Sequence, residues 1–162
     1  MRNIVLARID DRLIHGQIVT SWCKSNRAQV ILIADDKLTQ DNFTQRLLRA
    51  AAPPDIRVEI KTVEEAANYL LEEDPKQERI ILLTKIPQTM RDLIARNVQI
   101  TSINLGGMGA KAGRSRLNKN ISASPEEVEC LKELMQKGID IYYQLIPADH
   151  ATNLKNILKG ER

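Results

Sequence analysis

The sequence predicts an α/β fold in which helices cover both faces of a mostly parallel sheet. Segments with strand character alternate with segments of helical periodicity along the whole chain. Two of the predicted strands, 29–34 and 79–83, are almost continuously apolar, which is typical of strands buried on both faces. The 162 residues contain no repeat or linker, and this length suits a single core. We therefore expect one domain over residues 1–162.

Strands and helices can be assigned in order along the chain. The predicted strands occupy residues 4–7, 29–34, 57–60, 79–83, 100–105, 116–121 and 140–146. Apolar residues recur at helical spacing in segments 18–22, 43–51, 63–71, 90–94, 128–135 and 154–158. Thr62 with Glu65, and Ser124 followed by Pro125, are typical helix starts, and Pro87 is a further candidate start. The short, more polar strand 57–60 is expected at an edge of the sheet.

The composition argues against several classes of protein. The net charge is +3, Lys and Arg are scattered among acidic residues, and aromatic residues make up 3% of the chain, so nucleic-acid binding is not expected. Cys23 and Cys130 fit no zinc-binding spacing, and we expect no metal or other cofactor. No apolar run approaches the ~20 residues of a membrane helix, and the N-terminus lacks the apolar core of a signal peptide. We therefore expect a cytoplasmic protein with reduced thiols.

Reactive and charged side chains are concentrated in residues 8–16, between the first strand and the first helix. This segment holds two arginines, two aspartates and His15, one of only two histidines in the chain. Loops at the carboxyl ends of parallel strands bind ligands, and the N-terminus of a helix favours anions. We interpret the segment as a phosphate site in which His15 is the nucleophile. A capping or surface role for His15, and turn or N-cap roles for Asp10 and Asp11, are the alternatives. The second histidine, His150, is interpreted as a capping or surface residue at the entry of the last helix.

A second unusual segment is rich in glycine. Four of the seven glycines of the chain fall within residues 106–114. The part from 107 to 112 matches the loose dinucleotide pattern G-x-G-x-x-A, but no helical periodicity follows it, as that pattern requires. Two other interpretations are open. The segment is a mobile loop, or it is a second wall of the phosphate pocket, where missing side chains let backbone N–H groups approach an anion.

The sequence resembles the IIB components of the bacterial sugar phosphotransferase system, in the mannose–fructose–sorbose family. The active-site signature of that family is matched by residues 8–18, Arg-Ile-Asp-Asp-Arg-Leu-Ile-His-Gly-Gln-Ile, and a second motif by residues 104–108, Asn-Leu-Gly-Gly-Met. Length and element order agree as well, so the likeness covers essentially the whole chain. The resemblance implies a single three-layer α/β domain around a seven-stranded, mostly parallel sheet.

The resemblance also implies a function. His15 would accept a phosphoryl group from a phosphohistidine on the IIA component and pass it to a sugar that the IIC and IID membrane components bring in. Such a phosphocarrier works in the cytoplasm, at the inner face of the membrane, and needs no cofactor. The alternative is a regulatory protein that binds an anion or a phosphoprotein at the same loop without onward transfer.

Roles can be assigned residue by residue. Arg12 is expected to clamp the phosphate, because its planar fork meets two oxygens at once. Asp10 is expected to orient Arg12 or the imidazole of His15. Arg8 is a weaker candidate phosphate ligand that could instead pair with Asp10. The remaining groups expected to bind phosphate are Gly16 and Gln17 at the helix start, and Gly106 and Gly107, which border the pocket if the first and fifth strands end at the same edge of the sheet.

Overall fold

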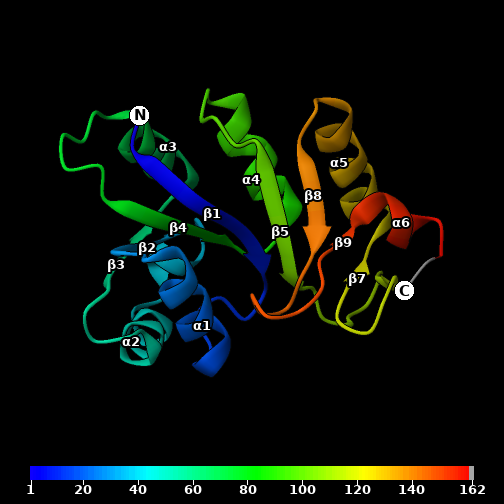
Figure 1. Ribbon diagram of the computed structural model, residues 1–162, viewed down its shortest axis with the longest axis horizontal. Coiled ribbons are helices and arrows are strands. Elements are labelled where there is room, and N and C mark those ends of the chain that lie inside the picture. Colours follow the sequence, from blue (N-terminus) through cyan, green and yellow to red (C-terminus); the bar gives the residue numbers. More distant parts are fainter. Residues whose placement is uncertain (161–162) are drawn as a thin grey trace.

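A seven-stranded sheet forms the centre of the molecule (Figure 1). The computed structural model describes residues 1–160, apart from the side chain of Ile18, which lies in the predicted first helix. In spatial order the strands are β3 (Arg57–Lys61), β2 (Val30–Ala34), β4 (Arg79–Thr84), β1 (Asn3–Asp10), β5 (Ser102–Gly107), β8 (Asp140–Tyr143) and β9 (Thr152–Asn153). All neighbouring pairs are parallel except β8 with β9. The mostly parallel sheet and the edge position of β3 confirm the prediction.

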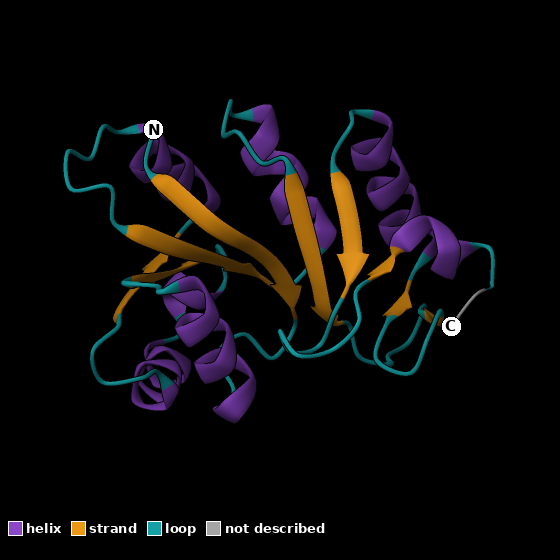
Figure 2. Cartoon of the chain, viewed as in Figure 1, coloured by secondary structure: helices purple, strands orange, loops and turns teal. Residues whose placement is uncertain are grey.

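Helices cover both faces of this sheet, giving three layers (Figure 2). The helices are α1 (Gly16–Asn26), α2 (Asn42–Ala51), α3 (Val63–Leu71), α4 (Pro87–Ala95), α5 (Pro125–Gln136) and α6 (Leu154–Leu158), with a short 3-10 helix, η1 (Leu38–Gln40), between β2 and α2. The two faces of β2 show why the strand is apolar throughout. Ile31 and Ile33 pack in the core beneath α1 and α2, whereas Val30 and Leu32 pack in the larger core beneath the other helices. Successive side chains point to opposite faces, so a strand covered on both sides needs apolar residues at every position.

Local signals fix several helix starts. Thr62 accepts a hydrogen bond from the backbone N–H of Glu65, and the Glu65 side chain accepts one in return, which completes a capping box. Ser124 and Glu127 form the same arrangement at α5. Pro87 occupies the first turn of α4, where its missing N–H removes no helical bond. These helix starts lie where the sequence predicts them.

Strand β1 runs further than predicted. The polar segment was expected to leave the strand at residue 8, but β1 continues to Asp10, and Arg8 and Asp10 are buried within it. The glycine-rich segment likewise begins inside a strand, because Gly106 and Gly107 end β5. Polar residues and glycines are poor strand formers on their own, and here pairing with neighbouring strands overrides that preference.

Two strand predictions in the C-terminal half were wrong, and one short strand was missed. Residues 116–121 do not form a strand; they join β6 (Ser115–Arg116) to β7 (Ser122–Ala123) in a small antiparallel hairpin. The strand predicted at 140–146 ends at Tyr143, and β9 was not predicted because two residues carry no periodicity. His150 was predicted to be a capping or surface residue; it is exposed in the loop before β9, which confirms the surface alternative, while Asn153 caps α6.

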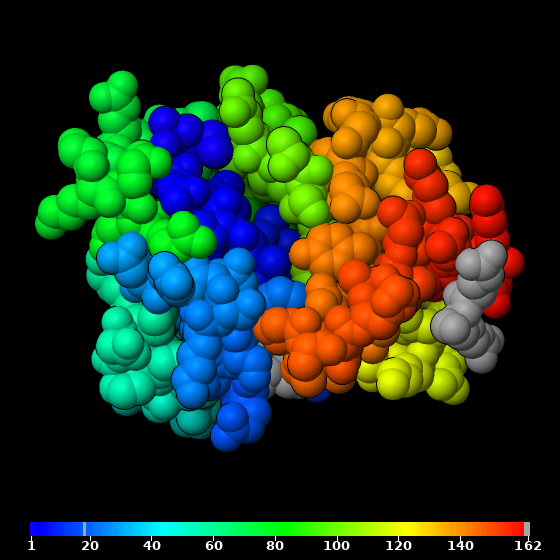
Figure 3. All heavy atoms as spheres, in the orientation of Figure 1, coloured from blue at the N-terminus to red at the C-terminus, as the bar shows by residue number. Residues whose placement is uncertain are grey.

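The segment that follows β8 returns across the molecule to α1. In the space-filling view the two lie against each other on one face (Figure 3). The indole Nε1 of Trp22 donates to the carbonyl oxygen of Leu145 at 2.9 Å. Within residues 1–160, no helix is long and apolar enough to cross a membrane, and no three His, Cys, Asp or Glu side chains gather as a metal site.

Candidate active site

A buried ion pair lies at the carboxyl end of β1. Arg8 and Asp10 are two residues apart, so both side chains leave the same face of the strand. Their side chains are 1% and 0% exposed, and Arg8 Nη2 donates to Asp10 Oδ2 at 3.0 Å. Arg8 Nη1 donates to Asn104 Oδ1 and to the carbonyl oxygen of Gln144, and its guanidinium lies over the Trp22 ring, 5.4 Å from the centroid. Burial lowers the pKa of Arg8, although the charge and hydrogen bond of Asp10 oppose this.

Asp10 links Arg8 to the loop that follows the strand. Its Oδ1 accepts from the backbone N–H of Arg12 at 3.1 Å and from Arg12 Nε at 3.3 Å, and its Oδ2 lies 2.9 Å from His15 Nε2. Burial alone would raise the pKa of Asp10, but the hydrogen bond and charge of His15, the N–H of Arg12 and the charge of Arg8 together lower it. Asp10 is therefore an ionised carboxylate at neutral pH, despite being fully buried.

A tight turn brings His15 back onto Asp10. The N–H of Leu13 donates to the Asp10 carbonyl oxygen at 2.9 Å, and Leu13 adopts a left-handed backbone with φ +56°. That conformation is costly for a residue with a Cβ. Burial of the Leu13 side chain, which is 2% exposed in the core beneath α1, stabilises it. Gly16 is also left-handed, at φ +51°, and begins α1.

His15 occupies the N-cap position of α1 but does not cap it. Its side chain makes no capping hydrogen bond and turns to Asp10 instead. Because the Asp10 carboxylate is an acceptor, His15 Nε2 carries the proton of this bond. In the neutral form of this ring, the lone pair lies on the remaining nitrogen, Nδ1. The side chain is 20% exposed, so the ring can be approached from solvent.

Arg12 and the end of β5 complete the surface around His15. The Arg12 side chain is 51% exposed while remaining paired with Asp10. Gly107 is the register partner of Asp10, and a Cβ there would lie 3.0 Å from Asp10 Oδ1 and 3.1 Å from Arg12 Nη2. A Cβ on Gly106 would overlap the Arg8 guanidinium. These two glycines therefore make room for the charged side chains of β1.

The structure brings most of the predicted site residues together. Arg8, Asp10, Arg12, His15 and Gly107 lie around one strand end, as described above. Gly16 and Gln17 lie next to them at the exposed start of α1. Arg8 differs from the others in position, because Asp10 separates its buried guanidinium from His15.

A second buried arginine, Arg114, was not singled out from the sequence. Its side chain is 1% exposed and makes two hydrogen bonds of 2.8 Å with Glu127. It also donates to the Gly109 carbonyl oxygen at 2.8 Å and lies 3.4 Å from Asp11 Oδ2. Asp11 in turn accepts from the Gly109 N–H at 2.7 Å. The β1–α1 loop and the glycine-rich segment are thus joined to α5, and the segment is tied down at several points.

Arg114 and Glu127 also shift each other's pKa values. Burial by itself would raise the pKa of Glu127, but the hydrogen bonds from Arg114 and from the Ser124 N–H lower it. The hydrogen bond to Glu127 raises the pKa of Arg114. Both groups are therefore charged at neutral pH. Nothing in the spacing of Asp11, Arg114 and Glu127 along the chain indicates that they meet.

Comparison with known proteins agrees with this arrangement. The model of the family "PTS system sorbose subfamily IIB component" matches residues 4–162. The sorbose-specific EIIB component of Klebsiella pneumoniae is 34% identical over 151 residues, which cover 93% of this chain and 92% of that protein. The mannose-specific EIIAB component of Escherichia coli K12 is 32% identical over 157 residues, 96% of this chain and 48% of that protein.

A solved structure agrees over the same length. The IIBSor domain of the sorbose permease from Klebsiella pneumoniae superposes with a TM-score of 0.93 at 32% identity, covering 99% of this chain and 98% of that one. The family match spans nearly the whole chain, and the fold confirms it. The chain therefore belongs to the sorbose subfamily of IIB components of the sugar phosphotransferase system, a family of phosphotransferases that take part in sugar transport.

Proposed function

We propose that the chain is a phosphocarrier in which His15 accepts a phosphoryl group from the IIA component and passes it to a sugar during uptake through IIC and IID. One observation carries the proposal most directly. His15 Nε2 is held by the buried, ionised Asp10, while the ring is reachable from solvent beside the half-exposed Arg12. This geometry orients a nucleophilic nitrogen next to a group that binds phosphate.

In the first transfer, the lone pair of His15 Nδ1 attacks the phosphorus of the donor phosphohistidine. The new N–P bond forms as the donor N–P bond breaks, and the donor imidazole leaves with that electron pair. The proton on His15 Nε2 stays in its hydrogen bond to Asp10. Positive charge that develops on the phosphorylated ring is stabilised by this carboxylate, which costs no reorganisation because it is already in place.

In the second transfer, a sugar hydroxyl oxygen attacks the same phosphorus. The O–P bond forms, the bond from Nδ1 to phosphorus breaks with its electron pair returning to Nδ1, and the hydroxyl proton passes to solvent. Arg12 stabilises the charge on the phosphoryl oxygens in both steps, since phosphoryl transfer depends mainly on position and charge. The N–H groups of Gly16 and Gln17 at the start of α1, and the close approach allowed by Gly107, supply further contacts.

Arg8 has a supporting role in this proposal. Its guanidinium is buried behind Asp10 and binds Asn104 and the Gln144 carbonyl oxygen. It keeps Asp10 ionised and fixed in direction. We therefore assign Arg8 as a positioning residue that acts through Asp10, rather than as a group that touches the phosphate, and Gly106 as the residue that makes room for it.

The partners follow from the family. The mannose-specific relative is named an EIIAB component, and this chain covers 48% of its length, which supports a IIA component as the phosphoryl donor. The onward step requires the IIC and IID membrane components that present the sugar. In this proposal the chain works in the cytoplasm and meets the membrane only through those components.

A labelling experiment tests the proposal. Wild type, His15→Ala and His150→Ala are phosphorylated from a phosphorylated IIA donor carrying radioactive phosphate. We expect full label on His150→Ala, none on His15→Ala, and label on the wild type that survives alkali but not acid. Membranes containing IIC, IID and sugar should then remove the label. Label on His15→Ala contradicts the site, and label that is never passed on contradicts the carrier role in favour of a regulatory one.

A further inference from the structure

A cavity of about 520 Å³ lies beside the β1–α1 loop. Arg12 forms part of one wall, and the end of β5 with the following backbone, 107–110, forms another. The third wall comes from the β6–β7 hairpin, through Arg116, Lys119 and Ser122. Arg12 thus faces both this cavity and the Asp10–His15 pair.

The charges around the cavity favour an anion. Three cations line it, namely Arg12, Arg116 and Lys119. The one carboxylate among its lining residues, Asp11, is already engaged by the Gly109 N–H and by Arg114.

A second cavity provides an internal contrast. It measures about 670 Å³ and is lined by Asp36, Glu64 and Asp92 with one arginine, Arg96. That cavity would repel a phosphate. The smaller cavity would attract one, so the preference comes from its own residues rather than from the net charge of the chain.

The hairpin holds its polar groups in fixed positions. The side-chain oxygen of Asn118 accepts from the N–H groups of Asn120 and Ile121, at 3.0 and 2.9 Å. Arg116 Nε donates to the Asn118 carbonyl oxygen at 3.2 Å, which orients the guanidinium. Asn120 Nδ2 donates to the Tyr143 hydroxyl. Groups held in this way lose little freedom when they bind a ligand.

We propose that this cavity binds a sugar phosphate, the product of the second transfer. The inference rests on the proposed function and names the substrate class of the same site. The cations would hold the phosphate, while Asn120, Ser122 and the 107–110 backbone offer neutral groups that bond to hydroxyls. The volume falls within the ~300–1,000 Å³ of small-molecule sites and exceeds what a bare phosphate needs. Because Arg12 is shared, the phosphate end of the product lies beside the group that delivered it.

A titration of the ¹⁵N-labelled full chain tests this site, with mannose 6-phosphate as the probe. We expect amide shifts concentrated at 107–110 and 116–122. Lys119→Gln should weaken binding about tenfold, the lower end for a hydrogen bond to a charged group. Lys111→Gln is the matched control, because it removes the same charge from an exposed residue of the neighbouring loop that does not line the cavity. It should change the affinity by no more than about twofold, as expected for a screened surface charge.

Two further ligands separate the possible results. Free mannose should not bind measurably, and inorganic phosphate should bind at least about tenfold more weakly than the ester, since it lacks the hydroxyl contacts. Equal affinity for inorganic phosphate overturns recognition of a sugar ester. Shifts outside the cavity, or equal effects of Lys119→Gln and Lys111→Gln, overturn the site itself.

The labelling experiment and the binding titration can fail independently, so each proposal is tested by itself. Absence of label on His15 with normal mannose 6-phosphate binding contradicts the carrier role alone. Normal labelling without binding contradicts this inference alone.

Discussion

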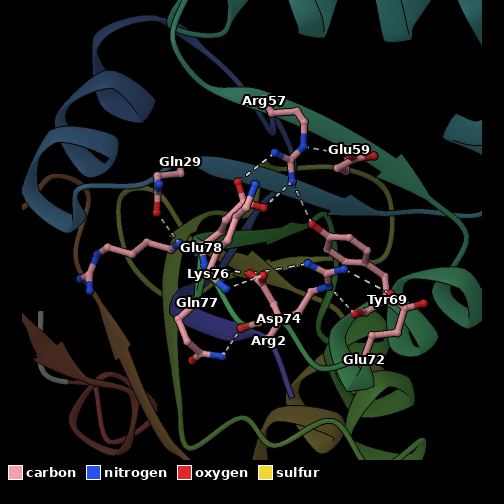
Figure 4. Close-up of polar contacts among 11 residues, drawn as sticks. Arg2, Gln29, Arg57, Glu59, Tyr69, Glu72, Asp74, Lys76, Gln77 and Glu78 are labelled. Atoms are coloured by element: carbon pink, nitrogen blue, oxygen red, sulfur yellow. Dashed lines mark hydrogen bonds and ion pairs between the residues drawn. The ribbon is translucent and has the colours of Figure 1, made fainter.

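The two ends of the central sheet carry similar charged residues in different surroundings. At the carboxyl end lie Arg8, Asp10, Arg12 and His15. At the amino end lies a group that we call the amino-end cluster, shown in Figure 4. It consists of Arg2, Gln29, Arg57, Glu59, Tyr69, Glu72, Asp74, Lys76, Gln77 and Glu78. Both groups contain arginine–carboxylate pairs, yet only the group at the carboxyl end contains a histidine.

The amino-end cluster joins separate segments of the chain through hydrogen bonds and ion pairs. Arg57 points toward Glu59, Glu78 and the Tyr69 hydroxyl, and so connects the edge strand β3 to α3 and to the segment before β4 (Figure 4). Asp74 accepts from the N–H groups of Lys76 and Glu78 and thereby fixes the turn before β4. The Arg57 side chain is 46% exposed, and ion pairs that remain in water contribute little each.

The group at the carboxyl end differs in two ways: its arginine–carboxylate pair is buried, and its histidine ring keeps one nitrogen without a bond to that pair. Arg8 and Asp10 are both buried, so removing either one leaves the other as an unpaired buried charge and strongly lowers stability. His15 uses only one ring nitrogen to join them. Charge pairing alone therefore does not distinguish the candidate site from the amino-end cluster. The difference lies in the buried Asp10 carboxylate, which contacts a histidine ring that solvent can reach.

The largest expected difference between the two ends concerns stability. Asp10→Ala leaves the Arg8 guanidinium buried without its carboxylate and should lower the free energy of unfolding by about 3–5 kcal/mol. Glu78→Ala removes an equivalent partner from the exposed Arg57 and should cost no more than about 1 kcal/mol. Denaturation by urea measures both. The double variant Arg8→Met with Asp10→Ala should recover most of the loss. If it is no more stable than Asp10→Ala, the unpaired charge is not the cause.

The next effect concerns transfer rather than stability. Arg12→Lys should slow phosphoryl acceptance by on the order of 10², because an ammonium group cannot make the two parallel contacts of a guanidinium. Its stability should stay within about 0.5 kcal/mol of the wild type, since the residue is half exposed. Arg57→Lys at the other end should leave the transfer rate unchanged. Rapid-quench measurement of labelling decides the matter, and a rate for Arg12→Lys within a few-fold of wild type would remove Arg12 from the site.

The neighbouring glycines should separate stability from transfer. Gly106→Ala places a methyl group on the buried Arg8 guanidinium and should lower stability by about 1–3 kcal/mol. Gly107→Val instead crowds Asp10 and the half-exposed Arg12, and should impair transfer more than stability. Thermal unfolding and labelling of the two variants give the comparison. Equal losses of stability with normal transfer would show that Gly107 does not border the site.

The smallest effect is a difference in how salt changes acid unfolding. The folded-state pKa values of Asp10 and Glu78 are both lowered, the first by His15, Arg12 and Arg8 against the opposing effect of burial, the second chiefly by its hydrogen bond from Arg57. Each carboxylate therefore stabilises the fold above its unfolded pKa, about 4. This stabilisation is lost as the pH falls through the lower folded value.

The two contributions can be separated with matched variants. We expect 1 M salt to reduce the Glu78 contribution, obtained by comparison with Glu78→Gln, because exposed charges are screened. The Asp10 contribution, obtained with Asp10→Asn, should change much less. Unfolding free energies measured between pH 5 and pH 2 at low and high salt give both values, and equal salt sensitivity would contradict the contrast in burial.

The sequence alone determined the layered fold and the position of the charged loop that contains His15. Continuous apolar strands such as 29–34, alternating with helical stripes, leave few arrangements besides a sheet covered on both faces. Local start signals placed α3, α4 and α5, since a capping box or an N-terminal proline acts within one turn. The charged segment containing His15 was visible because its residues are adjacent along the chain.

Only the tertiary structure decided which of those charges face water. Arg8 became a buried partner of Asp10 because β4, β5 and Trp22 close around it, and none of these neighbours lies beside it in the sequence. The contact of His15 Nε2 with Asp10 depends on the left-handed turn at Leu13, a conformation that is unfavourable for a residue with a Cβ. The β6–β7 hairpin and the Arg114–Glu127 pair depend on contacts between segments, and no repeating pattern in the sequence indicates these contacts. Periodicity and caps are local properties, whereas burial and pairing belong to the assembled sheet.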